Sequence, residues 1–333
     1  MGLPGERAEA GSDRATPELS AVVPVYGCRN CLETLHARLT AALGDLVSDY
    51  EIVFVDDRSP DGAWESLQEF AERDAHTVAI RLSRNFGQHA AITAGLEAAR
   101  GDWVVVLDCD LQDPPEDIKR LYAKALEGYD VVYAQRRRKG TGGFRRLGSR
   151  LYFRLMNVFA GASFEEAGSF SIVSRRVVEE FLRFKDRHRH YLLMLHWLGF
   201  DTASIEYEQP ARHAGRSSYG VRGLVGHALD GLFFQTTVLL RWVVLLGFGF
   251  ALAGLGIATY FLIAKLTGHA APGFTSLAVF TLTVGGFIII STGITGLYIG
   301  RVFEQVRERP LFVVDVVVGG TPARARAGER AER

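Results

Sequence analysis

The sequence predicts an α/β protein: a Rossmann-like domain with a mostly parallel sheet, followed by interface helices and a hairpin of two transmembrane helices. Two observations lead to this prediction. Five apolar runs before residue 135 alternate with stretches of helical periodicity, which is typical of parallel βαβ units. Two apolar segments without charged residues, 242–264 and 275–300, each reach the roughly 20 residues that cross a bilayer.

The composition excludes some classes of partner. The 333 residues carry 38 Lys and Arg against 38 Asp and Glu, so net charge gives no reason to expect nucleic-acid binding. Three cysteines, Cys28, Cys31 and Cys109, are too few for a disulfide framework and fit a reduced compartment. The Cys28-x-x-Cys31 spacing would suit a redox pair or half of a zinc site, but no second Cys or His pair at ligand spacing accompanies it.

The elements of the first domain can be taken in order. Residues 1–18 are rich in Ala, Gly, Glu and Arg and lack the apolar core of a signal peptide, so we expect a disordered lead and a cytoplasmic domain after it. Buried strands are expected at residues 21–26, 51–57, 77–82, 103–107 and 130–134. Helices are expected after the first strand, through Leu32, Leu35 and Leu39, and at residues 87–99.

Acidic residues follow the fourth strand, at the edge of an open α/β sheet where ligands bind. Asp108 and Asp110 are two residues apart and point the same way along an extended chain, and Gln112 follows them. Two carboxylates and an amide carbonyl suit Mg²⁺ or Mn²⁺, which would bridge a diphosphate leaving group. The alternative is a solvated turn after a buried strand. No glycine-rich phosphate loop follows the first strand, so phosphates would be held by the metal.

Several motifs together resemble one family. These are Val25-Tyr26 after Pro24, Val55-Asp56-Asp57, Asn85-Phe86-Gly87, Ala94-Gly95-Leu96, Gly101-Asp102 and the acidic run from Asp108 to Glu116. They resemble family 2 glycosyltransferases, and within these the polyprenyl-phosphate sugar transferases of the dolichyl-phosphate-mannose-synthase type. The resemblance runs from about residue 20 to residue 311. It implies a GT-A fold over residues 19–218, a nucleotide-sugar donor and a polyprenyl-phosphate acceptor.

The resemblance also assigns residues to the donor and the metal. Asp56 and Asp57 would contact base and ribose, Asp108 the ribose or sugar, and Asp110 with Gln112 the metal. The full set implied for the nucleotide-sugar is Pro24, Tyr26, Asp56, Asp57, Asn85, Asp108 and Asp110.

A second set of residues is implied for the lipid phosphate: Arg136, Arg145, Ser149, Arg212, Arg216 and Ser217. A phosphate brought beside a diphosphate is repelled unless fixed cations offset the charge. Arg145 and Ser149 are four residues apart and share a helix face. As an alternative, the arginines between residues 145 and 154 form a solvated or headgroup-facing surface.

Catalytic roles are implied for Asp108, Asp110, Arg136, Glu166 and Arg212. Glu166 matches an acidic position of the family, and Ser169 stands where relatives commonly have Asp. The acceptor phosphate oxygen is already anionic, so no general base is required and we expect one inverting displacement at the anomeric carbon.

The C-terminal half predicts a membrane anchor. Residues 219–237 form an expected amphipathic interface helix, and residues 238–264 and 275–300 two transmembrane helices. Arginines outside the spans outweigh Lys265 in the linker, which places both ends in the cytoplasm, here at a bacterial inner membrane. Glycines in both spans permit close helix approach and a homo-oligomer, with a tetramer among the possibilities. Residues 301–320 are expected to add an edge strand to this or a neighbouring subunit, followed by a disordered tail, 321–333.

Donor identity is not set by these motifs. UDP-glucose is the preferred donor, with GDP-mannose and UDP-galactose as alternatives. A processive polysaccharide synthase of the same fold is the nearest rival function, although Val238 occupies the place of its interface-helix glutamine and two spans are few for a channel. A membrane-anchored scaffold without turnover is a more distant rival, because it would need neither acidic pair nor phosphate-binding arginines. With only two spans, a separate flippase would have to move the lipid-linked sugar across the membrane.

Overall fold

The computed structural model describes residues 17–136, 167–184, 186, 189–207, 238–267, 273–307 and 309–320. The chain divides into two compact units, which are considered separately. The first comprises Met1–Lys139, Glu166–Arg216 and Pro310–Arg333, and the second comprises Gly140–Glu165 and Ser217–Arg309.

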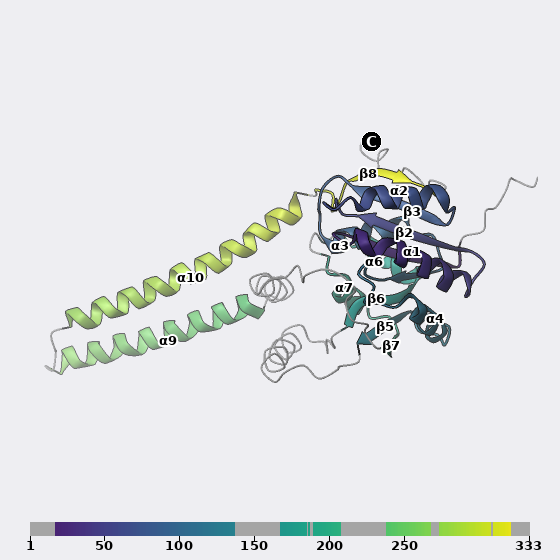
Figure 1. Ribbon diagram of the computed structural model, residues 1–333. Coiled ribbons are helices and arrows are strands. Elements are labelled where there is room, and N and C mark those ends of the chain that lie inside the picture. Colours follow the sequence, from purple (N-terminus) through teal and green to yellow (C-terminus); the bar gives the residue numbers. More distant parts are fainter. Residues whose placement is uncertain are drawn as a thin grey trace, which may run out of the picture. The chain divides into compact units, whose positions relative to one another are not determined.

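An eight-stranded sheet forms the centre of the first unit, in the order β7-β5-β6-β4-β1-β2-β3-β8 (Figure 1). Its strands are β1 (Leu19–Val25), β2 (Tyr50–Asp56), β3 (Thr77–Leu82), β4 (Trp103–Val106), β5 (Val131–Arg136), β6 (Ala167–Ser174), β7 (Thr202–Tyr207) and β8 (Val314–Val318). β1 pairs in parallel with β2 and β4, and β5 with β7. Only β6 and β8 run antiparallel to their neighbours among the described strands. The prediction of an α/β fold with a mostly parallel sheet is confirmed.

Helices cover both faces of this sheet because the central strands are apolar on both sides. One face packs against α1 (Arg29–Gly44), α2 (Ala63–Arg73) and α4 (Ile118–Ala125), the last preceded by the short helix η1 (Pro115–Asp117). The other face packs against α3 (Gln88–Ala98), α6 (Arg175–Arg183) and α7 (Tyr191–Leu198). Along β1 the residues alternate accordingly, with Val23 in the first core and Val22 in the second.

A close approach of α3 to the sheet depends on a glycine. A Cβ placed on Gly95 would lie 2.3 Å from Val22 Cγ1 and 3.2 Å from Val55 Cγ2. No side chain fits at this position without moving the helix, so the glycine permits the close packing of α3 on the sheet.

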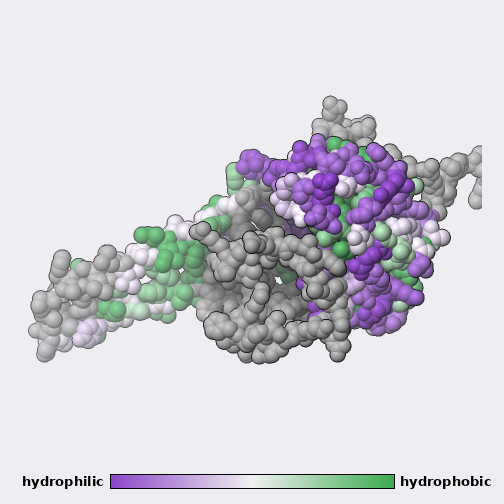
Figure 2. All heavy atoms as spheres, viewed as in Figure 1, coloured by the Kyte–Doolittle hydropathy of each residue, from purple (hydrophilic) through white to green (hydrophobic). Residues whose placement is uncertain are grey.

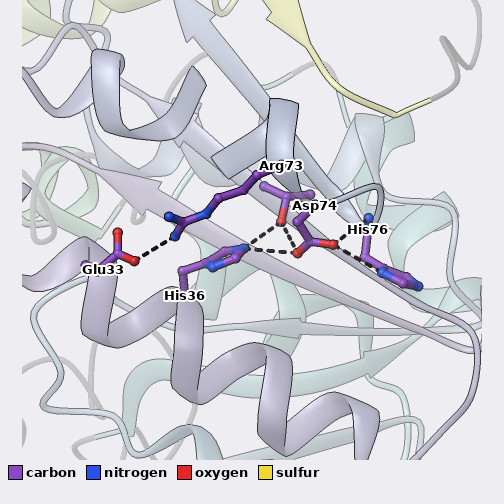
Figure 3. Close-up of polar contacts among 6 residues, drawn as sticks. Glu33, His36, Arg73, Asp74 and His76 are labelled. Atoms are coloured by element: carbon purple, nitrogen blue, oxygen red, sulfur yellow. Dashed lines mark hydrogen bonds and ion pairs between the residues drawn. The ribbon is translucent and has the colours of Figure 1, made fainter. Parts of the chain in front are cut away.

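Buried polar residues tie the helices to the amino edge of the sheet (Figure 3). His36 of α1 stacks on Phe70 of α2, with ring centroids 4.7 Å apart. Its Nε2 lies 3.0 Å from Asp74 Oδ2 and 2.9 Å from Thr77 Oγ1, at the start of β3. This cluster lies at the end of β3 opposite to the strand end where ligands bind in such sheets.

The C-terminal segment adds the last strand. β8 pairs antiparallel with β3, with Ala79 opposite Val318 and Leu82 opposite Val314. Asp315 of β8 accepts a hydrogen bond from Arg58 Nη1 at 2.8 Å. The sequence leaves open whether this strand joins the sheet of its own subunit or that of a neighbour. In the structure it joins the sheet of its own chain.

The second unit contains two long helices, α9 (Val238–Leu266) and α10 (Phe274–Val306). They pack side by side, with the rings of Phe250 and Phe287 stacked at 4.8 Å. Apolar residues gather along both, whereas hydrophilic residues dominate the visible face of the first unit (Figure 2). By length and composition, the described residues contain one helix able to cross a membrane, Thr283–Gly300, with mean hydropathy 1.5. The apolar stretch found in α9, Val243–Ile257, is shorter.

Candidate active site

The carboxyl ends of the parallel strands bring predicted donor residues, and the arginine predicted for the lipid phosphate, to one edge of the sheet. Tyr26 follows β1, Asp56 ends β2, and Arg136 ends β5. The acidic loop, which we define as Asp108–Gln112, follows β4. Because β6 is antiparallel to β4, its first residues reach the same edge of the sheet, and Ser169 is one of them.

Asp108 is held by two donors from different elements. Gln88 Nε2, at the start of α3, donates to Asp108 Oδ1 at 2.8 Å, and Ser169 Oγ, from β6, donates to the same oxygen at 2.7 Å. Burial, and secondarily the charge of Asp113, raises the pKa of Asp108 to about 6. An approaching cation would favour its ionised form, so the carboxyl is suited to a site that binds a metal or a positively charged group.

Asp110 lies in a tight turn. Gln112 N donates to Asp110 Oδ1 at 3.1 Å, and the intervening Leu111 has a positive φ of 61°. A buried leucine rarely adopts this backbone conformation, and such strained residues concentrate at functional sites.

The donor set fits a hard divalent ion. Asp108 and Asp110 offer carboxylate oxygens and Gln112 an amide oxygen, and Mg²⁺ in nucleotide sites is commonly held by one or two carboxylates plus substrate phosphates. Among the described residues no group of three or more His, Cys, Asp or Glu could hold a metal.

A buried network links the acidic loop to Arg136. Tyr207 OH, at the end of β7, donates to Asp113 Oδ1 at 2.6 Å and accepts from Arg136 Nε at 3.1 Å. The second oxygen of Asp113 accepts from Asp108 N at 3.2 Å. Asp113 is fully buried, and burial raises its pKa. One carboxylate thus fixes both the acidic loop and the predicted phosphate-binding arginine.

The two carboxylates predicted to contact the nucleotide hold the loops after β2 and β3. Asp57 accepts from Phe86 N at 2.7 Å and Gly87 N at 2.8 Å, so it holds the loop after β3. Asp56 accepts from Ser59 N at 2.9 Å, while its Oδ2, 3.4 Å from Arg81 Nε, has no hydrogen-bond partner among the described residues. Asp56 is fully buried, and its Oδ2 faces Arg81 rather than solvent.

The remaining predicted donor residues differ in exposure. Tyr26 is 52% exposed and Asn85 is exposed, so both side chains are available to a ligand. Pro24, in contrast, is buried within β1 opposite Val55, so its side chain packs within the sheet and is not exposed to a ligand. Burial also raises the pKa of both Asp56 and Asp57.

The expectation that the cysteines are all reduced is corrected. Cys28 and Cys109 form a disulfide, with Cα atoms 6.4 Å apart. The free cysteine is Cys31, which is buried in α1, so Cys28-x-x-Cys31 is not the bonded pair. The two bonded residues are 81 positions apart, and only the fold brings them together.

Part of the predicted acceptor site lies outside the described residues. These residues are Arg145, Ser149, Glu166, Arg212, Arg216 and Ser217, together with the expected interface helix at residues 219–237. Conversely, the structure adds Gln88, Asp113 and Tyr207 to the site, and it gives Ser169, which the resemblance places at a family position, a hydrogen bond to Asp108. Two of the added residues could have been noticed from their place in a motif, since Gln88 follows Asn85-Phe86-Gly87 and Asp113 lies within the acidic run that the resemblance uses. Tyr207 carries no such signal.

Comparisons with known proteins identify the family. Residues 20–182 match the sequence profile "Glycosyl transferase family 2". An undecaprenyl-phosphate 4-deoxy-4-formamido-L-arabinose transferase of Pseudomonas aeruginosa is 37% identical over 92% of this chain and 91% of its own length. The chain belongs to glycosyltransferase family 2. An uncharacterized glycosyltransferase of Synechocystis is 34% identical over 91% of this chain and 96% of that protein. Family membership makes the protein a glycosyltransferase with a GT-A-like fold, as the motifs predict.

Two solved structures resemble the fold at lower sequence identity. Glucosyl-3-phosphoglycerate synthase from Mycobacterium tuberculosis, solved with Mn²⁺, UDP and phosphoglyceric acid, is 19% identical, with a TM-score of 0.47 over 65% of this glycosyltransferase and 76% of that chain. S. aureus TarS 1-349 in complex with UDP-GlcNAc is 17% identical, with a TM-score of 0.45 over 66% of each chain.

Proposed function

We propose that this glycosyltransferase transfers one sugar from a nucleotide-diphosphate donor to polyprenyl phosphate, with undecaprenyl phosphate as the acceptor. The observation that carries the proposal is the extent of the match to the P. aeruginosa transferase, which is named for undecaprenyl phosphate. It covers 92% of this chain, whereas the family profile ends at residue 182. The likeness therefore extends through the segments that contain α9 and α10, and with them the part of the chain suited to a lipid acceptor.

On the donor side, the acidic loop would bind the diphosphate through Mg²⁺ or Mn²⁺, held by Asp110 and Gln112. The metal would offset the charge that develops on the leaving nucleoside diphosphate. Asp56 and Tyr26 would contact the nucleoside, and Asp108, fixed by Gln88 and Ser169, would face the sugar or ribose.

On the acceptor side, the phosphate oxygen attacks the anomeric carbon as the bond to the donor diphosphate breaks, so configuration inverts. The nucleophile carries no proton to remove, and a general base is unnecessary. Arg136 is the described cation suited to holding the acceptor phosphate, with Arg145, Ser149, Arg212, Arg216 and Ser217 as its proposed partners. Glu166 would position acceptor or sugar.

UDP-glucose is the first proposed donor. A second candidate is a nucleotide-linked 4-deoxy-4-formamido-L-arabinose, because the 37% identical relative is named for that sugar. GDP-mannose and UDP-galactose are further candidate donors, and processive synthesis of a polysaccharide is the rival reaction.

The proposed location is the bacterial inner membrane. α9 and α10 would form the transmembrane hairpin, with the catalytic unit and both termini in the cytoplasm. The lipid-linked sugar would require a separate flippase, and glycines of α9 and α10 would support a homo-oligomer.

The test is sugar transfer by purified full-length protein in detergent. Labelled UDP- and GDP-sugars, including the 4-formamido-arabinose donor, are offered with undecaprenyl phosphate, with and without Mn²⁺ or Mg²⁺. We expect one donor to give a single-sugar, organic-extractable product, and chelation by EDTA to abolish it. Label found only in long water-soluble polymer would favour the synthase, and absence of transfer from every donor would contradict the proposed activity.

A matched pair of variants tests the acidic loop. Asp110→Ala should abolish metal-dependent donor binding and turnover, because it removes a proposed metal ligand. Asp102→Ala is the control, since Asp102 is an exposed aspartate immediately before the same strand, β4, at its other end. Equal loss of turnover in both variants would contradict the assignment.

A further inference from the structure

The disulfide connects the two loops that border the proposed metal site. Cys109 lies between Asp108 and Asp110, and Cys28 lies in the loop between β1 and α1. Cys109 is 8% exposed, whereas Cys28 is half-buried and is the more accessible sulfur. In a reducing compartment such a pair is present as two thiols. The two cysteines therefore have two forms, the disulfide seen here and the reduced dithiol.

The loop that carries Cys28 is anchored on its other side. Gly27 N donates to Ser59 Oγ at 2.7 Å, and Arg29 N donates to Asp61 Oδ2 at 2.8 Å. Both bonds connect it to the loop after β2. Because Cys28 is fixed in this way, making or breaking the disulfide should displace the acidic loop rather than the loop after β1.

Backbone strain in the acidic loop favours a change of its conformation when the disulfide is reduced. Leu111 has a positive φ of 61° two residues after Cys109, a conformation that costs a leucine free energy and persists only where surrounding contacts impose it. Metal coordination tolerates displacements of only a few tenths of an ångström. A shift of Asp110 between the bonded and the reduced state would therefore change metal and diphosphate binding.

We propose that Cys28 and Cys109 form a reversible oxidative modification site, and that the disulfide form binds the metal–nucleotide pair more weakly than the dithiol form. The inference rests on the proposed function, because it takes the acidic loop to be the metal and donor site. It makes the dithiol the active form of the enzyme.

The oxidation balances with a peroxide as oxidant. The Cys28 thiolate attacks one oxygen of hydrogen peroxide, the O–O bond breaks, and a sulfenic acid and hydroxide form. The Cys109 thiol then attacks the Cys28 sulfur, forming the S–S bond and releasing water. A small dithiol reverses the reaction by thiol–disulfide exchange.

Cys31 provides an internal control. It is buried one helical turn after Cys28, and burial, followed by the charge of Asp110, raises the pKa of its thiol. Because the thiolate is the reactive form, Cys31 should react slowly and take no part.

The experiment compares full-length protein in detergent after reduction with dithiothreitol and after peroxide treatment, with the oxidant removed. Intact mass should show loss of two hydrogens, and peptide mapping should join Cys28 to Cys109. Calorimetric titration with Mn²⁺ and UDP should show binding weakened about tenfold or more by oxidation, the scale seen when the surroundings of a metal ligand are disturbed. Hydrogen exchange should slow at the amides of the acidic loop in the oxidised form.

The variants separate this site from other oxidation. Cys28→Ser should bind Mn²⁺ and UDP equally before and after peroxide, whereas Cys31→Ala should respond as the wild type does. The proposal is overturned if oxidised and reduced wild type bind equally, if the oxidised form binds more tightly, or if Cys28→Ser loses binding on oxidation. Reduced protein that binds Mn²⁺ and UDP but transfers no sugar would instead contradict the proposed function and leave the redox effect on binding standing.

Discussion

At the scale of single residues, the active site depends on one buried carboxylate with three kinds of partner. Asp113 accepts from the Tyr207 hydroxyl and from the Asp108 amide, and its ion-pair distance to Arg136 Nη2 is 3.9 Å. A charge removed from water is tolerated only when such partners compensate it. Asp113 therefore couples the acidic loop of the donor site to the arginine proposed for the acceptor.

Tyr207→Phe should impair acceptor use more than donor binding. The change removes the hydroxyl that Arg136 Nε donates to, and leaves Asp113 Oδ1 without its 2.6 Å donor, at a cost of about 1–3 kcal/mol. We expect kcat/KM for undecaprenyl phosphate to fall about tenfold, the rate equivalent of about 1.4 kcal/mol. The Kd for Mn²⁺ and UDP should change by less. Steady-state kinetics and calorimetry measure the two quantities.

Tyr133→Phe is the matched control. Its hydroxyl is buried on β5 and has no hydrogen-bond partner within the part of the chain that the structure describes. Removing it should leave both constants unchanged. An equal effect of the two substitutions would show that loss of a buried hydroxyl, and not release of Arg136, determines the result.

At the scale of elements, α3 brings functional residues to the sheet edge through its close packing. Gln88 at its start reaches Asp108, and Gly95 farther along allows the helix to lie against β1 and β2. The position of Gln88 therefore depends on a contact two helical turns away.

Gly95→Ala should destabilise the catalytic unit by about 1–3 kcal/mol, as overpacking of a core does. The added methyl would lie 2.3 Å from Val22 Cγ1, so α3 must shift outward. Gly44→Ala is the control: Gly44 ends α1, and a Cβ there would meet only Tyr50, at 3.8 Å. This variant should be neutral or more stable, since alanine favours helix over glycine. Urea denaturation of both variants measures the difference, and equal stability of the two would contradict the packing argument.

At the scale of the whole molecule, the sequence predicts what is periodic and local. The strands of the βαβ units are recognisable because each is an apolar run, and the acidic edge follows because parallel strands end together. Asp56, Asp108 and Arg136 could be assigned to one edge on that basis. Their surroundings could not: Tyr207 and Asp113 are 94 residues apart, and Cys28 and Cys109 are 81 apart. Such contacts depend on strand order and on the antiparallel insertion of β6, which local patterns do not encode.

The stability of the catalytic unit should depend on pH through His36. Burial, which outweighs the opposing effect of Asp74, lowers the pKa of His36. Below about pH 6.5 the unfolded chain binds a proton at this histidine and the folded chain does not, so the free energy of unfolding falls as pH falls, by up to about 1.4 kcal/mol per pH unit. The raised pKa values of Asp56, Asp57, Asp108 and Asp113 act in the opposite direction, because protonation of these buried carboxyls relieves their burial cost.

Comparison with His36→Gln separates the two contributions, because the carboxyls are present in both proteins. Between pH 7 and pH 5 the free energy of unfolding of the wild type should fall relative to that of the variant. This difference is expected even if the urea midpoint of the wild type changes little, because the carboxyls offset the effect of His36. Asp74 does not confuse the comparison: burial raises its pKa, but hydrogen bonds from His76 and Thr77 outweigh this and lower it, below the interval tested. Urea midpoints followed by tryptophan fluorescence provide the measurement. Parallel pH profiles would show that folding does not shift the pKa of His36. A wild type that gains stability relative to the variant as pH falls would show that Asp74 stabilises the imidazolium instead.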